Sequence, residues 1–271
     1  MNSAVREWLN LGVRWFHVFA GILWVGQTYY FTRLDGQFSK AEKNPTVGKS
    51  STVWMVHSGG FYTVEKQKSL GVSPELVRWF RWEAMLTWLS GLVLLTLVYY
   101  ASSGLIDPDV AQVSQGRGIV VGIAVLVGGW GIYDLAVRSA LGKSEAAFAV
   151  FAFLMTAAIS WGLLHVFSAR AAYLHVGALF GTIMTLNVWE RILPAQRKMI
   201  AAAAKEEAFD VRLSAQAKLR SKHNTFMAVP VVFLMISNHF PVATYGNAHS
   251  LEILLALVLV GWAAAKVVRS A

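Results

Sequence analysis

The seven histidines are the residues in this sequence best suited to chemistry, because the chain of 271 residues contains no cysteine. Without thiols, disulfides, Cys-ligated zinc, iron–sulfur clusters and covalently attached c-type haem are excluded, and imidazole is the main candidate metal ligand. Five of the histidines fall in or beside long apolar stretches: His17, His165, His175, His239 and His249. An ionisable group well inside an apolar span is costly and usually functional, which singles out His17.

Imidazoles carried by different helices at a similar depth are suited to holding a b-type haem between two of them. We expect His17 and His175 to be the first choice of ligands, followed by His239, His165 and His249. Arg14 lies one helical turn before His17 and could pair with a haem propionate. Trp24 and Asn238 complete the set expected around the cofactor. The alternative is that histidines at helix ends are ordinary solvated residues of the membrane interface.

A second group of ionisable residues is expected on the opposite side of the membrane. His57 lies in an apolar, aromatic run at 53–62, Glu83 near the start of the second span, and His223 just before the sixth. The run is too short to cross a bilayer and is typical of a re-entrant or interfacial segment. We predict a catalytic cup that binds a quinone head group or a small anionic heterocycle. The alternative is a basic surface that faces anionic lipids.

The composition places these residues in an integral membrane protein. The chain is 56% hydrophobic and 14% charged, whereas a soluble protein has about a quarter charged residues. Seven stretches are apolar and long enough to be transmembrane helices, so the predicted fold is an all-α membrane domain formed by the whole chain. The predicted spans are 8–31, 79–101, 118–137, 146–167, 171–189, 225–240 and 251–265.

The distribution of positive charge predicts how the helices are oriented. Twenty of the 24 lysines and arginines fall on one side, mainly in the long connections 32–78 and 190–222. Because cytoplasmic loops are enriched in Lys and Arg, the N-terminus is expected outside and the C-terminus in the cytoplasm, in a bacterial inner membrane. The net charge of +9 then needs no nucleic-acid partner. Connection 190–222 is rich in Ala, Lys and Glu, which predicts one amphipathic cytoplasmic helix.

Four blocks of sequence resemble one known family. They are RWFHVFAGILWVGQTYYFTRLD in the first span, VWMVHSGGFYTVEKQ in the loop, RWFRWEAMLTWLSG at the second span and RSKHNTFMAVPVVFLMISNHFP at the sixth. These blocks are similar to the membrane domain of the bacterial membrane-bound urate oxidases. The resemblance implies oxidation of urate in purine catabolism, with electrons passed to a c-type cytochrome that typical members carry as a C-terminal extension. This chain has no cysteine for covalent haem, so a separate cytochrome c, a respiratory-complex subunit or a quinone is expected as acceptor.

The function expected from residues and resemblance together is that of a haem b-bearing membrane redox protein. If urate is the substrate, Arg and Lys side chains would hold the anion while His57 or His223 removes a proton. The alternative is a non-catalytic transmembrane subunit of a larger respiratory or photosynthetic complex. A transporter is disfavoured, because the sequence shows no inverted repeat or paired broken helices.

Overall fold

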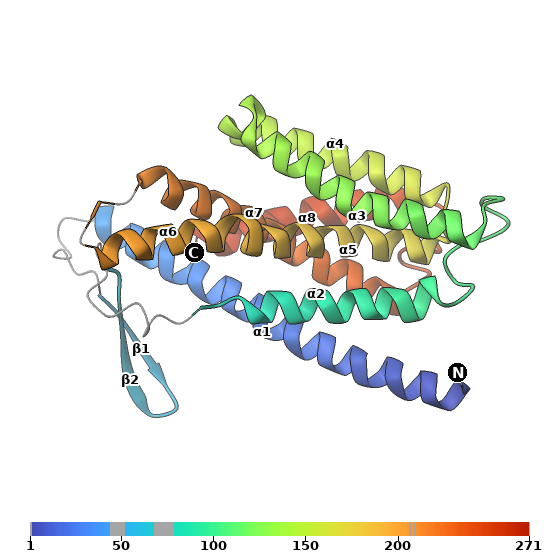
Figure 1. Ribbon diagram of the computed structural model, residues 1–271, viewed down its shortest axis with the longest axis horizontal. Helices are drawn as coiled ribbons and strands as arrows, with labels where there is room; N and C mark the ends of the chain where they lie inside the picture. The colour runs from blue at the N-terminus through green and yellow to red at the C-terminus, as the bar shows by residue number, and fades with distance from the viewer. Residues whose placement is uncertain (1, 44–51, 68–78, 206, 209, 271) are drawn as a thin grey trace.

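Long helices lie side by side along one axis in the computed structural model (Figure 1). The structure describes residues 2–43, 52–67, 79–205, 207–208 and 210–270. The helices are α1 (Ser3–Lys43), α2 (Trp82–Leu95), α3 (Gln115–Arg138), α4 (Glu145–Leu164), α5 (Ala169–Leu186), α6 (Leu193–Ala204), α7 (Val211–Ile236) and α8 (Ser250–Ser270). Two π-helical segments, η2 (Thr96–Tyr100) and η4 (Asn187–Ile192), extend α2 and α5, and 3₁₀ turns η3 (Ala140–Lys143) and η5 (Ser237–His239) follow α3 and α7.

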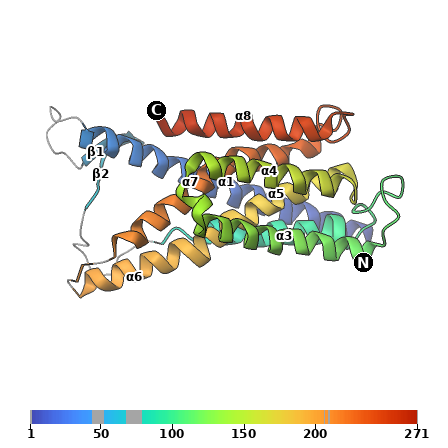
Figure 2. The ribbon, with the colours of Figure 1, turned by 90° about the horizontal axis from the view of Figure 1, so that it is seen from above.

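The prediction of an all-α membrane protein is confirmed in its main feature. In the described part of the chain, six helical stretches are long and apolar enough to cross a membrane: Ser3–Lys40, Trp82–Tyr100, Gln115–Arg138, Glu145–Leu164, Ala169–Ala204 and Ser250–Arg269. Most of the predicted span 225–240 lies in α7, which ends at Ile236 and continues into η5. The N-terminal half of α7 carries Arg212, Lys218, Arg220 and Lys222. Those charges lower the apolar character of α7 as a whole, although the helix runs beside the others (Figure 2).

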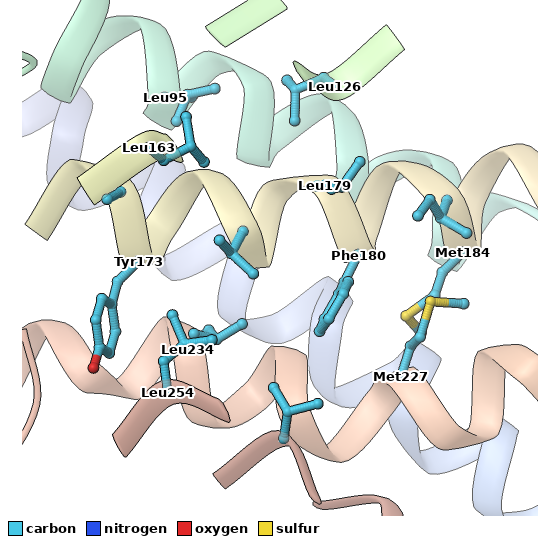
Figure 3. Packing of buried hydrophobic residues seen from close by; sticks show 14 of the residues in the cluster. Leu95, Leu126, Leu163, Tyr173, Leu179, Phe180, Met184, Met227, Leu234 and Leu254 are labelled. Atoms are coloured by element: carbon cyan, nitrogen blue, oxygen red, sulfur yellow. The ribbon is translucent and has the colours of Figure 1, made fainter. Parts of the chain in front are cut away.

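Helix α5 is the centre of the bundle. Tyr173, Val176, Leu179 and Ile183 along it are each 1% exposed or less. Figure 3 shows α5 between Leu95, Leu126 and Leu163 on one side and Leu234 and Leu254 on the other. The surrounding helices bury only one face each and present apolar side chains outward, such as Val120, Val127 and Leu154. This outward apolar surface is what lipid contact requires, because the bilayer core solvates apolar groups.

The connection 190–222 is not the single amphipathic helix predicted from its composition. Its first part continues α5 through η4 into α6, and its last part is the beginning of α7. The two helices pack against each other beyond the apolar bundle (Figure 1). Asp210 separates them as the N-cap of α7, where its side chain accepts a hydrogen bond from the Arg212 N–H at 2.9 Å. A capping carboxylate stabilises a helix start, so the strong helix formers on both sides belong to two helices. We call this end of the molecule the α6 end.

The apolar run 53–62 forms a β-hairpin, a structure that the sequence reading did not predict. Strands β1 (Thr52–His57) and β2 (Gly60–Glu65) pair antiparallel, with Trp54 opposite Thr63 and Val56 opposite Phe61. Ser58 and Gly59 both have positive φ, of 49° and 77°, as a two-residue type I′ turn requires. Tyr30 of α1 contacts Met55, so the hairpin packs beside α1 at the α6 end.

We predict that Gly261 is required for the contact between α8 and α7. A Cβ atom added there would lie 2.8 Å from Cγ and Cδ of Pro230, a rigid ring that cannot move aside. Gly261→Ala should therefore destabilise the folded state by about 1–3 kcal/mol, the usual cost of overpacking. Unfolding midpoints measured in one detergent check this. The control is Gly128→Ala in α3, where an added Cβ meets no atom within 4 Å; equal midpoints for the two variants would contradict the prediction.

Candidate functional site

A buried carboxylate joins three helices at the α6 end of the bundle. Asp134 of α3 accepts hydrogen bonds from Arg191 of η4, at 2.8 Å to Nε and 2.5 Å to Nη2, and from Arg220 Nη2 of α7 at 2.6 Å. The Asp134 and Arg220 side chains are each 5% exposed. Arg138, one turn after Asp134, adds a longer contact of 3.5 Å from a position near the surface. One buried carboxylate therefore faces several guanidinium groups, of which that of Arg220 is buried with it.

Asn187 extends this ion cluster into a hydrogen-bond network. Its Oδ1 accepts from Arg220 Nη1 at 3.2 Å, and its Nδ2 donates to the Tyr133 hydroxyl and to Asn224 Oδ1, both at 2.9 Å. The Tyr133 hydroxyl also forms a hydrogen bond with His223 Nδ1, 2.9 Å away. The His223 ring also stacks on Phe148, with centroids 4.6 Å apart.

The π-helical segment η4 explains how neighbouring residues reach different partners. A π-helix has more residues per turn than an α-helix and is frequent at functional sites. Asn187 contacts Tyr133 of α3 and Asn224 of α7, and Arg191 contacts Asp134 of α3. Trp189 between them packs against Trp82 of α2, with ring centroids 5.8 Å apart. This short segment thus joins the buried ion network to a second group of residues.

That second group is a tryptophan cluster formed by Trp24, Trp79, Trp82 and Trp189. Trp24, Trp79 and Trp189 pack around the buried side chains Ala84, Val188 and Leu193. The guanidinium of Arg81 lies 5.7 to 5.9 Å from the ring centroids of Trp79, Trp82 and Trp189. Glu83, two residues further along, accepts a hydrogen bond from Gln27 of α1 at 3.0 Å. The structure therefore places Trp24 and Glu83, predicted for different sites, near each other.

The two first-choice haem ligands are placed very differently. His175 is fully buried, its Nδ1 is 2.8 Å from the Ala171 carbonyl, and its Nε2 is 3.1 Å from the Tyr100 hydroxyl. Even a Cβ atom on Gly122 would lie 3.0 Å from that Nε2, so there is no room for a porphyrin there. His17 is half-buried, and its Nδ1 donates to the Thr87 carbonyl at 2.9 Å, which leaves Nε2 with a lone pair. A haem held between His17 and His175 does not fit this arrangement.

The remaining predicted residues do not converge on one point. His165, His239 and His249 are exposed, and His165 Nδ1 is 2.7 Å from the Trp161 carbonyl of its own helix. Asn238 pairs with Arg170, and Arg14 binds Asn10 at 3.2 Å. His57 is exposed on the hairpin with Nδ1 2.8 Å from the Ser58 hydroxyl. Within the residues described, no group of three or more His, Asp or Glu side chains is arranged to hold a metal ion.

Sequence reasoning missed the ion network because its members are far apart in the chain. Arg191 and Arg220 lie 57 and 86 residues from Asp134 and were counted only as loop cations. A signal was nevertheless present: Asp134 and Asn187 lie inside the predicted spans 118–137 and 171–189, and polar groups at membrane depth need partners. Spacing alone indicates only the outer pair with Arg138, at i and i+4.

Apolar helices with lipid-facing surfaces, closed at one end by an ion network, define a multi-pass membrane protein. The urate oxidase N-terminal family model matches residues 3–270. The chain therefore belongs to this family, that of the membrane-bound urate oxidase domain, and no cytochrome c domain is evident in its 271 residues. Comparison with curated proteins gave no match, and neither did comparison with solved structures.

We predict that Asp134→Asn strongly destabilises the protein. The change leaves Arg191 and Arg220 without their shared counterion, and breaking a buried ion pair from one side costs about 3–5 kcal/mol. The midpoint of thermal unfolding in detergent is the measurement. Asp210→Asn is the control, because the Asp210–Arg212 pair is at the surface and its loss should leave the midpoint nearly unchanged. A wild-type midpoint for Asp134→Asn would contradict the network's structural role.

Proposed function

We propose that this protein is a membrane redox domain that oxidises urate and passes the electrons to a separate cytochrome c. The observation that carries the proposal is the family match over residues 3–270. The α6 end supports it, because polar and aromatic side chains from α1, α2, α3, η4 and α7 meet there. Toward the opposite end the described residues include exposed histidines, the Arg170–Asn238 pair and His175, which is closely packed against Tyr100.

The topology proposed for this function has seven spans, with α7 as the sixth. Arg220 and Asn224 of α7 are buried against α3 and α5, so this polar half of the helix faces protein and its apolar half can cross the bilayer. Because cytoplasmic loops are enriched in Lys and Arg, the lysines and arginines at the α6 end support an orientation with that end in the cytoplasm and the N-terminus outside. The location that follows is a bacterial inner membrane.

Glu83 is the proton acceptor in this proposal. Oxidation of the urate monoanion to dehydrourate removes two electrons and one proton, so the site needs one base and an electron acceptor. His223 is poorly set for the base, because its Nδ1 is already hydrogen-bonded to the Tyr133 hydroxyl and its ring stacks on Phe148. Oε1 of Glu83 accepts from Gln27, whereas its Oε2 is buried without a partner in the described structure. Two molecules of cytochrome c each take one electron and complete the balance.

Haem b stays a prediction for this chain. The group would supply one-electron transfer inside the membrane, and His17 is the half-buried residue whose open nitrogen suits it. A purified protein that carries haem b should lose its Soret absorption in His17→Ala and keep it in His175→Phe. Soret absorption that is kept in His17→Ala and lost in His175→Phe would contradict the choice of His17 over His175 as the haem ligand.

The catalytic proposal is tested by anaerobic mixing of the purified full chain with urate and oxidised cytochrome c. We expect two molecules of cytochrome c to be reduced for each urate consumed. Glu83→Gln should slow this reaction by about 10²–10⁴-fold, the usual contribution of a general base, while Glu7→Gln on the exposed start of α1 should not. Folded protein that never reduces cytochrome c with urate would overturn the proposal.

The alternative function is that of a non-catalytic subunit in a larger respiratory or photosynthetic complex. Helix α1 favours it, because Trp8, Trp15 and Ile22 are 73%, 78% and 65% exposed on a helix that diverges from the bundle (Figure 1). Lipid or a neighbouring subunit can cover such a face. Gentle solubilisation distinguishes the two candidate functions. A chain that does not oxidise urate and always copurifies with oxidoreductase subunits supports the non-catalytic subunit.

A further inference from the structure

Arg81 is a partly buried cation with no anionic partner among the described residues. Its guanidinium is surrounded by indole rings, and its Nε–H is buried without a hydrogen-bond acceptor. The nearest carboxylate along the chain, Glu83, is directed instead to Gln27 of α1. A buried donor left unpaired costs about 1–3 kcal/mol. That cost is recovered if a ligand supplies the acceptor.

The aromatic side chains around Arg81 add flat apolar surfaces and a second unused donor. Trp82 and Trp189 meet edge to face at an interplanar angle of 70°, and Trp79 lies on the same guanidinium. Trp82 is 54% exposed, so the cluster is open on one side. The Trp189 indole N–H is buried and, like Arg81 Nε, has no acceptor in the part of the chain that is described. Indole faces stack well on planar rings.

Glu83, two residues after Arg81, adds a third buried polar atom without a partner among the described residues, its Oε2. The three atoms offer two donors, Arg81 Nε and Trp189 Nε1, and one acceptor, Glu83 Oε2. A planar heterocyclic anion has ring carbonyls for the two donors, a ring N–H for Glu83 and a flat face for the exposed Trp82 indole. A phosphate group has oxygens for the donors but no N–H for Glu83 and no flat face for the rings.

We propose that Arg81, Glu83 and the indoles of Trp79, Trp82 and Trp189 form a binding site for a planar heterocyclic anion of the urate type. This inference rests on the proposed function and gives its substrate a position. Arg81 carries the charge recognition, because its planar guanidinium can stack and donate at the same time. Trp189 belongs to η4, so ligand binding is directly connected with the segment that carries Asn187 and Arg191.

The experiment is calorimetric titration of the purified full chain with urate, without cytochrome c, so that no turnover occurs. Arg81→Gln should weaken urate binding about 10- to 100-fold, the loss of a hydrogen bond to a charged group. Trp189→Phe keeps a ring and removes the N–H, and should weaken binding about 2- to 10-fold. Arg117→Gln is the matched control, since Arg117 is exposed at the start of α3. Unfolding midpoints confirm that each variant is folded.

The outcomes separate this site from the proposed function. If the wild-type chain neither binds nor oxidises urate, the proposed function fails. If it binds urate and Arg81→Gln binds equally well, the function stands and the site is wrong. Inorganic phosphate is the second probe. Arg81-dependent binding of phosphate as tight as that of urate would show a site for phosphate or lipid headgroups. It would overturn the proposal that the ligand is a planar heterocyclic anion. Tight urate binding that weakens only in Arg81 and Trp189 variants supports the proposal.

Discussion

The structure depends on one carboxylate placed between guanidinium groups away from water. Asp134 holds η4 and α7 to α3 through Arg191 and Arg220. An ion pair at this depth gains little net stability, because the desolvation of the charges offsets their attraction. What it does impose is geometry, since any arrangement that separates these groups leaves a charge unpaired in an apolar environment. The relative positions of three helices at the α6 end are therefore defined by a few atoms.

The π-helical turn at η4 connects this constraint to the proposed binding site. Asn187 and Arg191 face the ion network, and Trp189 faces the tryptophan cluster around Arg81. Val188, the residue between Asn187 and Trp189 in η4, is buried with Ala84 at the start of α2. A side chain cannot move on one side of η4 without affecting the packing on the other. The rigid network thus acts as the support against which the more open Arg81 side chain is positioned.

The apolar helices could be predicted from the sequence, whereas the contacts that form the site could not. Spans 118–137 and 251–265 lie within α3 and α8, because runs of apolar residues are a local signal. The hairpin at 52–65 was missed because a short apolar run does not distinguish a strand from a membrane segment. Continuation of α5 into α6 was missed because charge was taken as a sign of a loop. The pairing of Asp134 with Arg191 and Arg220 needs the fold itself, and the Arg81 environment depends on Trp189, more than 100 residues away.

The most direct test is a structure of the full chain in lipid with urate, determined without an electron acceptor. The account predicts density for a flat ligand against the indoles of Trp82 and Trp189, with an oxygen within hydrogen-bond distance of Arg81 Nε and a nitrogen near Glu83 Oε2. Urate bound at the opposite end of the bundle, or an Arg81 side chain that contacts only a lipid phosphate while urate is bound elsewhere, would contradict it.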